Sequence, residues 1–165
     1  MMNYINRNHY SCFQLTTLVV LRVLVGWYFL YEGLTKLLSP GWTAYGYLLE
    51  SNGLFAPIFK GIAANPGLLA FADAVNVYGL TIVGLLLVLG LFEKVGYIGA
   101  AGFLLLYYLA HPPLLNVEYL FPTEGSYLWV DRNLIMLATV IVMLAFPTGK
   151  EIGLDRLIFR NKREK

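Results

Sequence analysis

Long, unbroken apolar runs dominate the chain. Four of them, at about 15–38, 68–92, 95–110 and 128–146, are each about long enough to cross a hydrocarbon core near 30 Å. Apolar residues in these runs are continuous rather than alternating at every second position, which favours helix over strand, and a helix satisfies its own backbone hydrogen bonds in lipid. The pattern predicts an all-α, integral membrane four-helix bundle that forms one transmembrane domain, 1–165.

The segment 41–65, between the first two runs, has a different pattern. Apolar residues recur at helical spacing over 42–49 and again over 55–62, with a break at the Ser-Asn-Gly sequence 51–53. The segment is rich in Trp, Tyr and Phe, which favour the membrane interface. We therefore expect two short amphipathic interfacial helices, which either cover the bundle or form a lateral gate for a lipid-soluble ligand.

Composition and charge support the membrane assignment and add an orientation. Hydrophobic residues make up 58% of the 165 positions, charged residues 13%, and the mean hydropathy is +0.64, outside the range of soluble domains. In a four-helix topology, eight basic residues fall on one side of the membrane, which places both termini in the cytoplasm by the positive-inside rule. These residues are Arg7, Lys94, Lys150, Arg156, Arg160, Lys162, Arg163 and Lys165.

The basic tail, 147–165, mixes apolar and basic residues. This mixture suits a short helix that lies on an anionic leaflet, so membrane lipids are expected partners. A basic tail beside a membrane span is the usual pattern of a cytoplasmic end, so we do not expect nucleic-acid binding.

Polar residues interrupt the runs mainly near their outer ends. Glu32 and Lys36, at i and i+4, predict an ion pair on one face of the first helix. Ionisable groups in a membrane usually face the bundle interior and pair there, so we expect them to converge with the polar residues of the other helices. Those residues are Asp73, Asn76, His111, Asp131, Arg132 and Asn133. Arg22 lies deeper, where it either extends to the cytoplasmic interface or caps an internal network.

This outer cluster has two interpretations, between which the residues do not decide. It is either a structural clasp between helices in lipid or a site that exchanges protons or binds a ligand. His111 presents the same choice on a smaller scale. It either stops the third helix before Pro112 and Pro113, or it donates and accepts protons at the mouth of a site.

The cysteine and histidine counts limit the cofactors that the chain can bind. A single cysteine, Cys12, provides no iron–sulfur or structural zinc set, and we expect no metal site. The two histidines, His9 and His111, lie at opposite ends of the predicted bundle. We therefore expect no bis-histidine haem within one chain.

Several short motifs lie at the ends of the predicted helices. They are "LRVLVGWYFLYEGLTKLLSP", "YYLAHPP", "PTEG", "DRNLI" and "FPTGKEIGLDRL". They resemble the DoxX/DoxD family of small four-helix bacterial membrane proteins, and the resemblance extends over nearly the whole chain, from about Leu21 to Leu157. The resemblance implies a multi-pass protein of the bacterial cytoplasmic (inner) membrane. The family-like positions are Glu32, Lys36, His111, Glu124, Asp131, Arg132 and Asn133.

The resemblance also implies a function. Members of the DoxD type form the small membrane subunit of a thiosulfate:quinone oxidoreductase, so the implied role is a subunit of a quinone-linked redox complex, with quinone as the cofactor and redox subunits as partners. Whether the chain forms a homo-oligomer stays an open question at this point. The chain has no fused partner segment and no cofactor motif of its own, so we do not expect it to oxidise thiosulfate alone.

Two hypotheses for the outer cluster follow. In the first, Glu32, Asp73 and His111 are the catalytic, proton-exchanging groups. The residues expected to bind the quinone head group are Lys36, Asn76, Tyr108, Glu124, Arg132 and Asn133. In the second, the chain is a non-enzymatic scaffold or assembly protein. A small transporter is disfavoured, because the halves show no repeat and no pair of broken helices.

Overall fold

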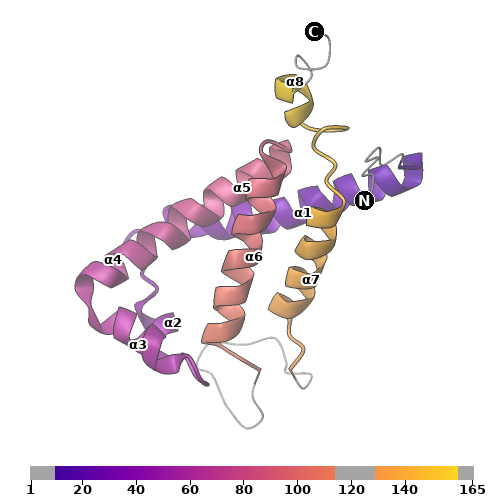
Figure 1. Cartoon of the computed structure of the whole chain (residues 1–165). Coiled ribbons are helices and arrows are strands. Elements are labelled where there is room, and N and C mark those ends of the chain that lie inside the picture. Colours follow the sequence, from indigo (N-terminus) through magenta and orange to yellow (C-terminus); the bar gives the residue numbers. More distant parts are fainter. Residues whose placement is uncertain (1–9, 114–128, 160–165) are drawn as a thin grey trace, which may run out of the picture.

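The computed structural model describes residues 10–113 and 129–159, and these residues form helices without any strand (Figure 1). The all-α class predicted from the sequence is therefore confirmed for the described part of the chain. The elements are α1 (Cys12–Leu37), α2 (Tyr45–Leu49), α3 (Ala56–Ala64), α4 (Pro66–Ala74), the π-helix η1 (Val75–Gly79), α5 (Leu80–Leu89), α6 (Glu93–Ala110), α7 (Arg132–Ala145) and α8 (Asp155–Phe159).

Local sequence explains both ends of α1. The Ser11 hydroxyl accepts a hydrogen bond from the Gln14 backbone N–H, and the Gln14 side chain accepts one from the Ser11 N–H, which is a capping box. The helix ends shortly before Pro40, which has no N–H to continue it. Capping at one end and proline at the other therefore set the length of α1 at 26 residues.

The second long helix runs without a break through α4, η1 and α5. Its start is fixed by Asn65, whose side chain accepts from the N–H groups of Gly67 and Leu68, and by Pro66 in the first turn. Its end is fixed by Gly90, which adopts a left-handed conformation with φ of 61°. Glycine is the residue that most readily adopts this C-cap geometry.

Two of the helices in the described residues are long and apolar enough to cross a membrane: Cys12–Leu37 and Pro66–Leu89. The helix α7 is also apolar, but its 14 residues span only about 21 Å. It begins later than the apolar run at 128–146, because Asp131 caps it by accepting from the Leu134 N–H.

The long helices pack in the order α1, α5, α6, α7, with α1 against α5, α5 against α6, and α6 against α7. Glycines allow α1 and α5 to approach closely: a Cβ at Gly84 would overlap the Leu30 backbone, and one at Gly33 would overlap Thr81. The packed helices enclose a continuous apolar core between them. Its fully buried members include Phe29, Leu80, Leu87, Tyr97, Leu104, Val140 and Met143.

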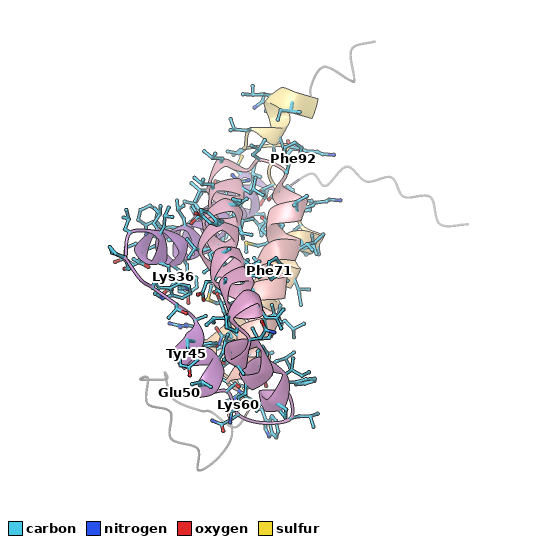
Figure 2. The ribbon with its side chains drawn as sticks, turned by 90° about the vertical axis from the view of Figure 1, so that its left-hand side faces the viewer. Lys36, Tyr45, Glu50, Lys60, Phe71 and Phe92 are labelled. Carbon is cyan, nitrogen blue, oxygen red and sulfur yellow. The ribbon has the colours of Figure 1, made fainter. Side chains whose placement is uncertain are left out.

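Polar side chains gather at two opposite ends of the helices. At the tail end, the turn between α5 and α6 meets the segment 147–159, which includes α8 (Figure 1). At the loop end lie α2, α3 and the last turns of α1 and α6. Figure 2 shows Glu50 and Lys60 at the loop end, at the opposite end of the molecule from Phe92.

Candidate functional site

The loop end brings Glu32 and Lys36 together as their spacing predicts. The Lys36 Nζ lies 3.5 Å from Glu32 Oε2. The two partners differ in exposure, since the Lys36 side chain is 17% exposed and the Glu32 side chain 42%. The carboxylate therefore remains accessible while the ammonium group is largely covered.

Two aromatic rings from other parts of the chain cover Lys36. Its Nζ lies 5.3 Å from the centre of the Trp42 ring and 5.9 Å from that of Tyr107. Both distances lie within the range of cation–π attraction, which favours a partly desolvated cation. The ring of Tyr107 thus links the end of α1 to α6.

The Tyr107 hydroxyl in turn binds η1. It donates a hydrogen bond of 2.6 Å to Asn76 Oδ1, and the Asn76 side-chain amide donates to the Ala72 carbonyl at 3.3 Å. Asn76 lies within the π-helix, a local widening that is frequent at functional sites. The second long helix therefore departs from α-geometry next to its contact with Tyr107.

His111 and Tyr47 close this side of the cluster. The centres of their rings are 4.0 Å apart, and the Tyr47 hydroxyl donates a hydrogen bond to the Tyr107 carbonyl at 3.4 Å. Burial lowers the pKa of His111 to about 4, so its imidazole is neutral at pH 7. A neutral imidazole can accept a proton, but it is a poor proton donor, so it fits only half of the proton-exchanging role that was one of the two expectations for His111.

Asp73 is bonded to the segment that precedes α2. Its Oδ1 accepts a hydrogen bond of 2.7 Å from the backbone N–H of Ala44, the residue that precedes α2. A second tie is the hydrogen bond of 3.1 Å from the Asn52 N–H to the Ala110 carbonyl. Together these bonds hold the segment between α1 and α4 against the helices.

The remaining predicted residues that the structure describes lie at the start of α7 or, in the case of Tyr108, on α6 beside it. The guanidinium carbon of Arg132 lies 5.5 Å from the centre of the Tyr28 ring on α1. The Asn133 side chain donates to the Asp131 carboxylate at 3.0 Å, and the Tyr108 hydroxyl donates to the Trp129 carbonyl at 2.9 Å. Glu124 lies outside the described residues.

Apart from His111, which lies beside Tyr47, and Glu124, the predicted site residues divide into three groups. Glu32, Lys36 and Asn76 lie around Tyr107, whereas Asp73 is bonded to Ala44. Those on or beside α7 make contacts with Tyr28 and with their own neighbours. The structure therefore brings part of the predicted set together and gives the rest local partners.

A second polar cluster, which sequence reasoning missed, lies at the tail end. Glu93, at the start of α6, is 2% exposed, and so is Arg22 of α1. Arg22 Nη1 lies 3.7 Å from Glu93 Oε1 and donates to the Thr148 hydroxyl at 2.9 Å, while Nη2 donates to the Ile152 carbonyl at 2.7 Å. Arg22 therefore caps an internal network, which was one of its two predicted roles.

Glu93 accepts most of the hydrogen bonds in this network. Its Oε1 accepts from the Tyr97 hydroxyl at 2.6 Å and from the N–H and hydroxyl of Thr148 at 3.0 and 3.1 Å, and its Oε2 accepts from the Gly149 N–H. A Cβ at Gly149 would lie 2.6 Å from Glu93 Oε2. The segment after α7 thus folds around the carboxylate.

Asp155 adds a second buried carboxylate at the tail end. It is 6% exposed and accepts from the backbone N–H groups of Phe92 and Glu93, at 2.8 and 3.2 Å. In this way it satisfies donors at the start of α6. We call Arg22, Glu93, Thr148 and Asp155 the tail-end network.

One comparison with known proteins gives a match. A family model described as DoxX matches residues 17–112, which is more than half of the chain. The matched region contains Arg22, Glu32, Lys36 and Glu93, so both polar clusters draw on it. No curated protein and no solved structure matches the chain.

Proposed function

Because the chain belongs to the DoxX family, we propose that it is a multi-pass protein of the bacterial cytoplasmic membrane and the membrane subunit of a quinone-linked redox complex. In this proposal α1, α4 to α5, α6 and α7 form the four-helix bundle, and the tail end faces the cytoplasm. Two membrane-length helices and the basic residues after α7 support this arrangement.

The arrangement around Lys36 carries the quinone proposal. A quinone head group is a planar ring with carbonyl oxygens, so it needs hydrogen-bond donors and flat apolar contacts. The Lys36 ammonium offers donors that Glu32 alone does not use up, and it lies beside the rings of Trp42 and Tyr107. The residues at this point therefore fit such a ligand, with its tail in the lipid.

Proton exchange would fall to Glu32. When bound, the quinone would accept or donate electron pairs, and each such change requires protons to enter or leave the head group. Glu32 is the more exposed partner of its ion pair, so it can exchange protons with water or with a ligand. His111 and Asp73 are second choices, because the first is half-buried and neutral and the second is bonded to Ala44.

The remaining residues would act around this point. Arg132 and Asn133 lie at the start of α7, and Tyr108 of α6 is bonded to Trp129 just before it, so these residues would limit access to the head group from that side. The electrons would come from a partner redox subunit.

Quinone binding is tested on the purified full-length chain in detergent. Thermal unfolding is measured with short-chain ubiquinone and menaquinone analogues, and a ligand present at 100 times its Kd is expected to stabilise the protein by about 2.7 kcal/mol. Lys36→Gln is expected to lose most of this stabilisation, whereas Lys60→Gln, an exposed lysine on α3, is expected to keep it. Equal responses of the two variants, or no response of the natural chain, would contradict the proposal.

A scaffold is the second candidate, favoured by the bond between Asp73 and the Ala44 N–H. In that case the loop-end cluster only holds α2 and α3 in place for a partner to bind. Asp73→Asn would then reduce recovery of partner subunits in pull-downs, and Lys36→Gln would leave electron transfer of the assembled complex unchanged. A fall in electron transfer with normal assembly for Lys36→Gln would instead favour the redox subunit.

A further inference from the structure

Within residues 10–113 and 129–159, α8 is bonded to the bundle on the side that carries Asp155. Asp155 binds the turn between α5 and α6 through the Phe92 and Glu93 N–H groups. Successive helical residues are turned by about 100°, so Leu157 lies on the face opposite Asp155, with Arg156 and Ile158 beside it. Leu157 is 68% exposed and Ile158 50%. The side of α8 away from the bundle is therefore apolar and flanked by a basic residue.

The position of α8 along the helices is equally well defined. The Leu154 N–H donates to the Leu89 carbonyl at 3.1 Å, and the Asp155 N–H donates to the Gly90 carbonyl at 3.0 Å. These carbonyls close the membrane-length helix Pro66–Leu89. The helix α8 thus begins level with the end of that helix, beyond the turn between α5 and α6 (Figure 1).

Basic residues surround α8 in the tail. The exposed basic residues of the described tail are Lys150 and Arg156, and four more follow in the sequence 160–165. Of the acidic residues in the tail, Asp155 is buried and bonded to backbone N–H groups, so it weakens the positive surface less than its formal charge indicates. Exposed apolar side chains among basic ones are typical of a helix that lies at the boundary of head groups and acyl chains.

We propose that Ile152, Arg156, Leu157 and Ile158, held in place by the tail-end network, form a binding surface for the anionic phospholipids of the adjacent leaflet. The network fixes the surface through Asp155, and it connects that surface to α1 through the bonds of Arg22 to Thr148 and Ile152. The proposal does not depend on quinone binding.

The test places a fluorescent reporter on the exposed face of α8. Cys12, the single natural cysteine, is replaced by Ser, and Leu157→Cys is labelled with an environment-sensitive dye. The full-length protein is placed in nanodiscs of phosphatidylglycerol or of phosphatidylcholine. The emission is expected to lie at shorter wavelength in phosphatidylglycerol, and the difference is expected to vanish in about 1 M salt, where the Debye length is about 3 Å.

Two charge variants complete the test. Replacing Arg156, Arg160, Lys162 and Arg163 together by Gln is expected to remove the difference between the two lipids, whereas Lys60→Gln at the loop end is expected to preserve it. The same emission in both lipids at low salt, or an undiminished difference after the fourfold replacement, would overturn the proposal.

Discussion

The two ends of the molecule each contain an ion pair, but the two pairs differ in burial and in the number of hydrogen bonds around them. At the tail end, Arg22 and Glu93 are each 2% exposed, and the chain surrounds Glu93 with hydrogen bonds from Tyr97, Thr148 and Gly149. At the loop end, Glu32 and Lys36 form one contact, and the Glu32 side chain is 42% exposed. Both pairs include a residue of α1.

Physical chemistry explains why the buried pair needs more partners. Burying a charge requires compensation by an opposite charge and by hydrogen bonds, because the lost hydration is worth several kcal/mol per ion. A partly exposed pair keeps water on one side and needs less compensation. The tail-end network therefore supplies the many partners that a buried pair requires, whereas the loop-end pair leaves the Glu32 carboxylate accessible.

The largest expected effect comes from removing the charge of Glu93. Glu93→Gln leaves the Arg22 guanidinium buried without its counter-ion, and breaking a buried pair in this way costs about 3–5 kcal/mol. Unfolding by a denaturing detergent, followed by circular dichroism, measures the loss. The control is Lys94→Gln, which neutralises the exposed neighbouring residue and is expected to change stability little. Similar stabilities for the two variants would mean that the buried pair does not stabilise the fold.

Gly149→Ala tests the packing of the same end. The new Cβ would lie 2.6 Å from Glu93 Oε2 and 3.1 Å from an oxygen of Asp155, so the loop must move away from the carboxylates. Overpacking of this kind costs about 1–3 kcal/mol. Gly102→Ala on α6 is the control, because nothing lies within 4 Å of its Cβ position. The same unfolding assay distinguishes them, and a neutral Gly149→Ala would show that the loop around Glu93 is looser than the contacts indicate.

Sequence reasoning found the loop end more readily than the tail end, for a physical reason. Glu32 and Lys36 lie one helical turn apart, so their spacing alone predicts the contact. The bonds of the tail-end network join residues far apart in the chain, with Arg22 and Thr148 separated by 126 positions and Glu93 and Thr148 by 55. No local pattern encodes such contacts, and a basic tail has the same composition whether it docks or not.

Some local features could have indicated the docking. Glu93 follows a glycine turn and starts a helix, and the tail carries Gly149, Gly153 and Asp155 within a few positions. Glycines in a short polar segment indicate close backbone contacts. The all-α class followed from the continuity of the apolar runs, whereas the π-helix at Asn76 has no counterpart in the sequence pattern and required the structure.

Glu32→Gln is the loop-end counterpart of Glu93→Gln and is expected to have a smaller effect. The pair is partly exposed, and such pairs contribute about 0.2–1 kcal/mol. We expect a correspondingly small loss of stability in the denaturing-detergent assay, and the proposed function adds an altered turnover of the redox complex. A loss as large as that of Glu93→Gln would remove the contrast between the two ends.

A pH dependence is also expected at the loop end. Burial lowers the pKa of His111 to about 4, below its ordinary value of 6.5. Between these values the unfolded chain binds more protons than the folded chain, so the contribution of His111 to stability is complete above pH 6.5 and is lost as the pH falls towards 4.

Melting temperatures are compared at pH 7 and pH 5 for the natural chain and for His111→Asn, whose side chain does not titrate. The natural chain is expected to lose more stability on acidification, because only its side chain must take up a proton in a half-buried position beside Tyr47. Equal losses would show that water reaches the imidazole as freely in the folded chain as in the unfolded one, and the loop end would then be open at His111 as well as at Glu32.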